Sequence, residues 1–128
     1  MYKKMAAFTL CLLVVSMLFI GCQANENGGA FTVINHETAM EMINFDPYII
    51  VLDVRSPGEH AQRRVNNSVL FPIDTINETT AAEIIPAKDT IVILYCASGN
   101  RSRRAALELS DLGYTNVYDM GGIPNWED

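Results

Sequence analysis

Residues 90–102 read TIVILYCASGNRS and combine three kinds of local sequence. The first six residues are apolar or β-branched, as is typical of a strand buried on both faces. The run leads directly into Cys96, and Gly99 then permits a tight backbone turn. From Ser102 onward, apolar residues recur at helical spacing. This stretch therefore predicts a buried strand, a short loop that carries a cysteine, and a helix.

The rest of the chain from residue 31 alternates in the same way. Tyr48–Val54 is a second β-branched run and predicts another central strand. Alternating strands and helices indicate an α/β three-layer sandwich, with a mostly parallel five-stranded sheet flanked by helices. The further elements expected are short strands at 31–34, 69–73 and 116–120, a helix capped by Asn35, a helix from a Thr75/Glu78 capping box to about Ile85, a helix over 102–112, and a terminal turn from Gly121.

Two loops follow the predicted central strands, Arg55–His60 and Cys96–Arg101. In parallel sheets, sites form beyond the carboxyl ends of the strands. A helix that begins just after Cys96 directs unpaired N–H groups and a partial positive charge toward the sulfur. These groups favour the thiolate and lower the pKa of Cys96. Arg101 ends the loop with a permanent cation, directed either toward a bound anion or toward a neighbouring carboxylate.

Four segments carry a family resemblance: YCASGNRS at 95–102, LDVRSPGEH at 52–60, GYTNVY at 113–118 and GGIPNW at 121–126. Together they resemble the single-domain rhodanese family. The resemblance spans residues 31–128, in order and in spacing, and implies the rhodanese-like fold. It also implies sulfane-sulfur transfer, in which Cys96 takes sulfur from thiosulfate or a persulfide and passes it to a thiol acceptor.

The resemblance assigns persulfide binding to the loop and requires no cofactor. The backbone amides of the loop would stabilise the charged sulfur. The loop residues concerned are Ala97, Ser98, Gly99, Asn100 and Arg101.

Asp53 and Arg55 have two interpretations, because they can form a structural ion pair at a strand end or contact substrate. Arg55 is the better candidate of the two for substrate. Glu59 is expected to brace the loop, and both His36 and His60 are expected to be solvated surface residues. With no second clustered cysteine and with the histidines far apart, we expect no metal site.

Two departures from the family pattern concern the substrate. The family commonly has Gly-His-Ile-Pro-Gly-Ala where this chain has RRVNNS at 63–68, which should alter that turn. Many members that use thiosulfate carry a cation inside the loop, whereas Ala97 is neutral. The weaker field for a dianion leaves a protein persulfide or a low-molecular-weight persulfide open as the donor.

Two other functions compete with the enzyme. A non-catalytic relay or partner-binding module would hold or sense sulfur without rapid turnover. A phosphatase is disfavoured by loop length, because only four residues separate Cys96 from Arg101. Related phosphatases on this fold carry five, which makes a wider cradle.

The N-terminal residues predict export. Lys3 and Lys4 precede an apolar run over 5–20, and Leu18–Cys22 resembles a bacterial lipobox. We therefore expect a signal peptide at 1–21, lipidation of Cys22 with a flexible tether to residue 30, and a domain over 31–128. The alternative is an uncleaved N-terminal anchor. Both place the domain outside the cytoplasm, attached to the bacterial membrane, or to an outer membrane if two exist.

Charge and cysteine content narrow the partners. The full chain has a net charge of −6. Without residues 1–21 it keeps 7 basic and 15 acidic residues, a net charge of −8, which argues against nucleic acid as a partner. Cys11 lies in the leader and Cys22 would carry lipid, so Cys96 would be the free thiol of the mature protein. We expect a monomer.

Overall fold

The structure is a computed structural model that describes residues 30–123. A five-stranded sheet has the order β1-β5-β4-β2-β3, and all four strand pairings are parallel. The strands are β1 (Thr32–Val33), β2 (Ile50–Asp53), β3 (Val69–Leu70), β4 (Val92–Cys96) and β5 (Val117–Gly122). The helices are α1 (His36–Phe45), α2 (Pro57–Gln62), α3 (Glu78–Ile84) and α4 (Asn100–Asp111), with a 3-10 turn at Ile73–Thr75.

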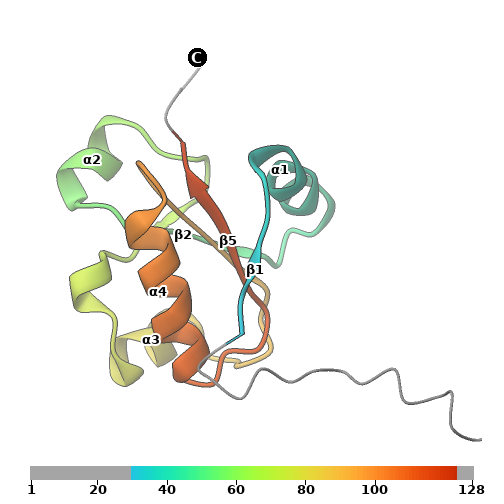
Figure 1. The fold of residues 1–128 in the computed structure, drawn as a ribbon, viewed down its shortest axis with the longest axis vertical. Coiled ribbons are helices and arrows are strands. Elements are labelled where there is room, and N and C mark those ends of the chain that lie inside the picture. Colours follow the sequence, from blue (N-terminus) through green and yellow to red (C-terminus); the bar gives the residue numbers. More distant parts are fainter. Residues whose placement is uncertain (1–29, 124–128) are drawn as a thin grey trace, which may run out of the picture.

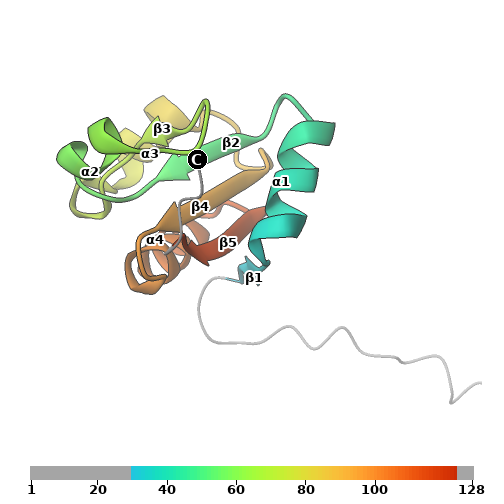
Figure 2. The ribbon, with the colours of Figure 1, turned by 90° about the horizontal axis from the view of Figure 1, so that it is seen from above.

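The sheet is the middle of three layers, as Figure 2 shows. Helix α1 covers one face, and α3 and α4 cover the other. The side chains of successive residues of β4 point to opposite faces of the sheet. Leu94 and Cys96 pack with Ala105 of α4, whereas Ile93 and Tyr95 pack with the α1 side. The predicted α/β sandwich is confirmed, and its sheet is wholly parallel among the strands described.

The carboxyl ends of the strands gather at one edge, where α2 and the start of α4 lie (Figure 1). Strand β4 is fully buried along its length, as its apolar sequence predicts. The hydrogen bond from the Val54 N–H to the Tyr95 carbonyl, at 3.2 Å, extends the pairing of β2 and β4 to this edge. The ends of the two predicted central strands are therefore adjacent.

Several element boundaries differ from the sequence prediction. The 55–60 segment expected as a loop contains α2, which begins at Pro57 behind a Ser56/Glu59 capping box. Helix α3 is capped by Asn77, with Thr80 as its partner, and not by Thr75. Asn77 accepts from the N–H groups of Thr79 and Thr80 and so satisfies the helix end, whereas the Thr75 hydroxyl donates to the Pro72 carbonyl at 2.7 Å.

Three further boundaries move because of tertiary contacts. Helix α4 begins at Asn100, two residues before Ser102, with Gly99 as its N-cap. Strand β3 is shorter than 69–73, since Ile73 starts the 3-10 turn. Gly121 belongs to β5 instead of beginning a turn, because β5 continues beside the end of β4.

The N-terminal predictions lie mainly outside the described residues. The signal peptide at 1–21, the lipidated Cys22 and the tether to residue 29 are therefore not described. Within residues 30–123, no helix combines the length and the apolar character that a membrane span requires.

Candidate functional site

The Cys96 sulfur lies at the carboxyl end of β4, directly before the first turn of α4. The Gly99 N–H donates a hydrogen bond to Cys96 Sγ at 2.9 Å. Gly99 has φ 94°, a left-handed conformation that glycine adopts without steric cost. The backbone thus folds over the sulfur and directs an N–H group at it. Cys96 itself has no exposed surface.

Two opposing effects act on the pKa of Cys96. Burial of the sulfur would raise the pKa, since it disfavours the charged thiolate. The backbone N–H and hydroxyl of Ser102, and the N–H groups of Gly99 and Ser98, more than offset burial and lower the pKa. Of these groups, the Gly99 N–H donates to Sγ, while the Ser102 hydroxyl donates to the Gly99 carbonyl at 3.1 Å. These groups favour the thiolate relative to an ordinary cysteine without an adjacent general base.

The end of β5 lies against the cysteine loop and holds it in position. The Ile123 N–H donates to the Cys96 carbonyl at 3.1 Å, and Gly122 pairs with Cys96 in the sheet. A Cβ on Gly122 would lie 2.6 Å from the Ala97 carbonyl oxygen and 2.8 Å from Ser98 Cα. Only a glycine at position 122 therefore allows the loop to rest on β5 in this position.

Arg101 is directed toward a carboxylate. Its two terminal nitrogens donate to Glu59 at 2.8 and 2.9 Å, which makes a bidentate ion pair. The N–H and hydroxyl of Ser56 donate to the same carboxylate, at 3.0 and 2.8 Å. The hydrogen bonds from Arg101 and then Ser56 hold the pKa of Glu59 far below its usual range. Of the two directions that the sequence allows for Arg101, the structure selects the carboxylate.

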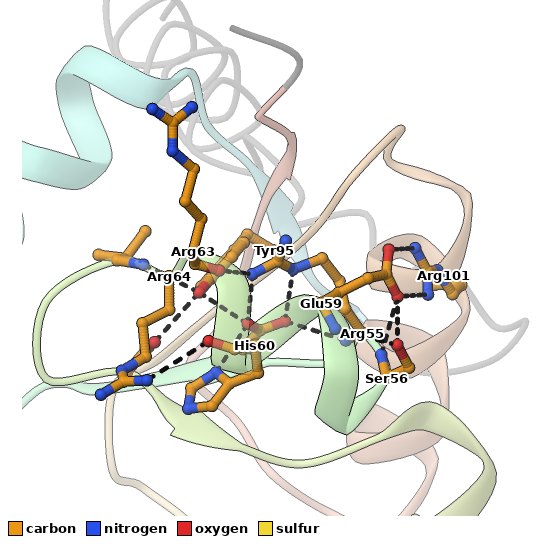
Figure 3. A network of polar contacts seen from close by, with 11 residues as sticks. Arg55, Ser56, Glu59, His60, Arg63, Arg64, Tyr95 and Arg101 are labelled. Carbon is orange, nitrogen blue, oxygen red and sulfur yellow. Dashed lines mark hydrogen bonds and ion pairs between the residues drawn. The ribbon is translucent and has the colours of Figure 1, made fainter. Parts of the chain in front are cut away.

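Asp53 and Arg55 form a second, buried bidentate pair. Arg55 Nε and Nη2 donate to Asp53 at 2.9 and 2.8 Å. Arg55 also donates to the Arg63 carbonyl. Burial alone would raise the pKa of Asp53, but hydrogen bonds from Arg55, His60 and Tyr95 outweigh it and lower the pKa. The structural interpretation of this pair thus accounts for its geometry. Figure 3 shows Arg55 near the Glu59–Arg101 pair.

The expectation that His60 is a solvated surface residue is wrong. Its Nδ1 lies 2.8 Å from Asp53 Oδ2, and its side chain is only 15% exposed. Helix α2 turns His60 back toward β2, which a loop over this segment would not do. His36, by contrast, is exposed at the start of α1, as expected.

The 63–68 turn is held by Tyr95 from the α1 side of the sheet. The Tyr95 hydroxyl accepts from the Val65 N–H at 3.0 Å, lies 3.1 Å from Ser68 Oγ, and donates to Asp53 at 3.0 Å. Asn67 takes a φ of 62°, which asparagine tolerates better than most residues. The family pattern quoted above has glycine at this position.

The structure brings most of the predicted site residues to one place. Cys96 and its loop follow β4, and Asp53 pairs with Tyr95 at the adjacent end of β2. Arg55 and Arg101 line the same cavity. Two contributors were absent from the predicted site, namely Ser102 and Gly122. A serine directly after the loop arginine, at the start of the predicted helix, was a usable signal for Ser102. Nothing in the local sequence indicates that Gly122 touches the loop.

The described residues contain no group of three or more His, Cys, Asp or Glu side chains that could hold a metal ion. A cavity of about 270 Å³ borders the cysteine loop and is lined by Arg101 and by residues that follow β2 and β3. A larger cavity of about 650 Å³ lies between α1 and the 64–67 turn. We associate the smaller cavity with the chemistry, because the larger one lies on the opposite face of the sheet from Cys96.

Known proteins with related sequences include a curated enzyme and two solved structures. Thiosulfate sulfurtransferase PspE of Escherichia coli is 35% identical over 72 residues, covering 56% of this chain and 68% of that protein. A structure of a rhodanese with anions from E. coli has 32% identity and a TM-score of 0.55, covering 58% of this chain and 86% of the other. A rhodanese-related protein from Thermoplasma volcanium has 36% identity and a TM-score of 0.59, covering 74% and 89%.

The Rhodanese-like domain family matches residues 35–128, which include every element from α1 onward. The relatives support a sulfurtransferase at moderate identity. The matched region contains four of the five strands of the parallel sheet, the cysteine loop at the end of β4 and Gly122 of β5, which lies against that loop. On this match, and on the fold and loop geometry above, the chain belongs to the rhodanese-like domain family.

Proposed function

We propose that the protein is a sulfurtransferase that carries a sulfane sulfur on Cys96 as a persulfide. The observation that carries the proposal is the sulfur environment. Cys96 Sγ accepts the Gly99 N–H at 2.9 Å, and hydrogen bonds from Ser102 and the loop lower its pKa against the effect of burial. A stabilised thiolate at the N-terminus of a helix is a nucleophile suited to attack on sulfur.

In the first half-reaction, the Cys96 thiolate attacks the outer sulfur of the donor. With thiosulfate, the S–S bond of the donor breaks and sulfite leaves with the bonding electrons. With an organic persulfide RS–SH, the thiolate RS⁻ leaves instead. In both cases the product is Cys96 with one added sulfur atom, and no external oxidant or reductant is required.

In the second half-reaction, an acceptor thiolate attacks the outer sulfur of the Cys96 persulfide. The Cys96 S–S bond breaks, the acceptor gains the sulfur as a persulfide, and the Cys96 thiolate is regenerated. The N–H groups of Ser98 and Gly99 that stabilise the thiolate also suit the persulfide anion. The loop therefore serves both charged states of the cycle.

Intact-mass measurement tests the proposal directly. The full chain is incubated with thiosulfate and, separately, with an organic persulfide, and its mass is recorded before and after cyanide treatment. We expect a gain of one sulfur atom that cyanide removes. Cys96→Ser should abolish the gain, while Cys22→Ser, the matched control at another cysteine, should retain it. Absence of an adduct with every donor would falsify the proposal.

A non-catalytic sulfur relay is the second candidate, favoured by the burial of Cys96. A sulfur with no exposed surface exchanges slowly with small molecules, and a partner protein that opens the loop would then control transfer. If Cys96 gains one sulfur atom but the protein then shows negligible steady-state turnover, the result indicates the relay. Sustained production of thiocyanate from thiosulfate and cyanide indicates the enzyme.

We also propose that the domain works outside the cytoplasm as a lipid-anchored protein. The proposal rests on the apolar run over 5–20, the lipobox-like Leu18–Cys22 and the polar segment that follows. Several acyl chains on one cysteine would hold the protein stably at a membrane. A tether of about eight residues would keep the domain within roughly 30 Å of the lipid surface.

A further inference from the structure

One small cavity opens beside the cysteine loop, between α2, the 3-10 turn after β3 and the start of α4. Its volume of about 270 Å³ is below the roughly 300–1,000 Å³ typical of sites for drug-sized ligands. The size therefore suits a small organic group. The lining residues are Val54, Arg55, Ser56, Pro57, Pro72, Ile73, Asp74, Thr75 and Arg101.

The cavity borders Arg101, which ends the cysteine loop, and Val54, which hydrogen-bonds to the residue before Cys96. Val54, one of its lining residues, packs in the same buried cluster as Cys96. The Val54 N–H also donates to the Tyr95 carbonyl, on the peptide that leads into Cys96. Arg101, on the other side, ends the cysteine loop. A donor whose outer sulfur approaches Cys96 from this side would leave its remaining atoms in the cavity.

Both arginines that line the cavity already bind carboxylates. Arg101 makes its bidentate pair with Glu59, and Arg55 makes its bidentate pair with Asp53. Each cation is thus matched by one anion at hydrogen-bond distance. The field that these arginines exert on an incoming anion is correspondingly small, because each acts as half of a neutral pair.

The other cations of this region lie elsewhere. The Arg103 guanidinium lies 5.9 Å from the Phe31 ring, and Arg64 donates to the His60 carbonyl and lines the larger cavity on the α1 side. Figure 3 shows the Arg63 guanidinium extending away from Arg101. None of these three cations is among the lining residues of the small cavity.

Two donors at the cysteine loop are already used locally. The Gly99 N–H donates to Cys96 Sγ at 2.9 Å, and the Ser102 hydroxyl donates to the Gly99 carbonyl at 3.1 Å. Asp74, an exposed carboxylate on the 3-10 turn, adds a negative charge to the cavity wall, beside the apolar Ile73 and Pro72.

From this charge pattern we infer that the cavity accepts the organic group of a low-molecular-weight persulfide, RS–SH, in which R carries no negative charge. This inference rests on the sulfur-transfer function proposed above. The Cys96 thiolate attacks the terminal sulfur, the RS–SH bond breaks, and RS⁻ leaves through the cavity. Asp74 acts as a specificity residue, repelling anionic donors and favouring those with an ammonium group.

The test compares two donors of similar size and opposite charge. The full chain in neutral detergent is given cysteamine persulfide, mercaptopropionate persulfide or thiosulfate at equal concentration, and the initial rate of sulfur gain at Cys96 is followed by intact mass. We expect the ammonium donor to load fastest. Asp74→Lys should shift the rate ratio of the two persulfides by about tenfold toward the carboxylate donor, and Asp74→Asn by less.

The matched control is Asp89→Lys, the same charge change at an exposed aspartate in the turn before β4, at the opposite edge of the sheet. Asp89→Lys should leave the rate ratio of the two persulfides unchanged. If the net charge of the protein alone set the ratio, Asp89→Lys would change it as much as Asp74→Lys does. Thiosulfate that loads as fast as the ammonium donor, or a ratio indifferent to Asp74, would overturn the inference and leave sulfur transfer standing. Loading by none of the three would remove the proposed function and this inference together.

Discussion

Glu59 and Arg101 face each other as a bidentate ion pair, and the same Glu59 carboxylate accepts the capping hydrogen bonds of α2 from Ser56. One side chain therefore both begins α2 and holds the last residue of the cysteine loop. Any displacement of α2 is transmitted to the start of α4 through this carboxylate. The pair is about one-third exposed on each side, so its strength depends on solvent and pH.

Replacing Glu59 with glutamine should lower the stability of the protein in a pH-dependent way. The folded state depresses the pKa of Glu59, so its stabilising effect is present above the unfolded value near 4.5 and is lost as pH falls toward the folded value. At neutral pH we expect Glu59→Gln to lose roughly 1 kcal/mol. Urea unfolding at pH 7, 5 and about 3 checks this. The difference from the unmodified chain should shrink at the lowest pH, while Glu83→Gln, at an exposed position of α3, should differ little throughout.

Gly122→Ala should displace the cysteine loop. The added Cβ would meet the backbone of Ala97 and Ser98 at 2.6 and 2.8 Å, and neither backbone segment can move without disturbing Cys96. We expect sulfur loading of Cys96 to fall by at least tenfold, equivalent to about 1.4 kcal/mol in the barrier. Gly58→Ala is the control, because a Cβ there meets nothing within 4 Å and alanine suits a helix. Equal loading by both variants would contradict the role given to Gly122.

Ser102→Ala should raise the pKa of Cys96. The Ser102 hydroxyl, which donates to the Gly99 carbonyl at 3.1 Å, is one of the groups that lower the pKa of Cys96 against the effect of burial, so its loss should raise that pKa. Thiolate absorbance in the ultraviolet, corrected by subtracting the Cys96→Ser signal, reports the midpoint. We expect the unmodified midpoint to lie below the ordinary 9.0 and the variant midpoint to move upward. Sulfur loading at neutral pH should slow in parallel and recover as pH rises.

Tyr95→Phe should destabilise the protein while sparing Cys96. Loss of the hydroxyl leaves the buried Val65 N–H without its acceptor, which costs about 1–3 kcal/mol. The ring lies on the α1 face, whereas Cys96 packs toward α4, so loading of the folded protein should persist. Chemical denaturation and intact mass measure the two quantities. The control is Tyr118→Phe, at a residue of β5 that lies on the same face of the sheet as Tyr95. It should change the free energy of unfolding by less than about 0.5 kcal/mol.

Cys22→Ser should release the protein from the membrane fraction when the chain is expressed in a bacterium. Without the thiol there is no site for the lipid, and the remaining domain is too acidic to bind anionic head groups by charge. Fractionation and palmitate labelling provide the measurement. Cys11→Ser is the matched control and should remain lipid-labelled. If Cys22→Ser stays in the membrane with an unprocessed mass, the uncleaved-anchor alternative holds.

The sequence was sufficient for the architecture because burial leaves a local pattern. The continuous apolar run of β4 and the run over 48–54 identify central strands, and alternation with helical segments identifies a parallel sheet. Cys96 and its loop could be found for a similar reason. The chemistry needs a particular order of residues between a strand and a helix, and that order is contiguous in the chain.

The sequence did not predict which residues the charged side chains would pair with. Glu59 and Arg101 are 42 positions apart, and the choice between a bound anion and a carboxylate for Arg101 depends on where α2 is placed. His60 was misjudged for the same reason, since α2 directs it to Asp53. Local spacing carries no information about which distant residues share an edge of a sheet.

By itself, then, the sequence determined the fold class and the position of Cys96, the proposed sulfur carrier, between β4 and α4. The tertiary structure decided the electrostatics around that cysteine. It neutralised Arg101 with Glu59 and Arg55 with Asp53, placed Asp74 at the cavity beside the loop, and brought Gly122 against Ala97. The physical reason is that Coulomb and contact energies depend on distance in space, which only the folded chain defines.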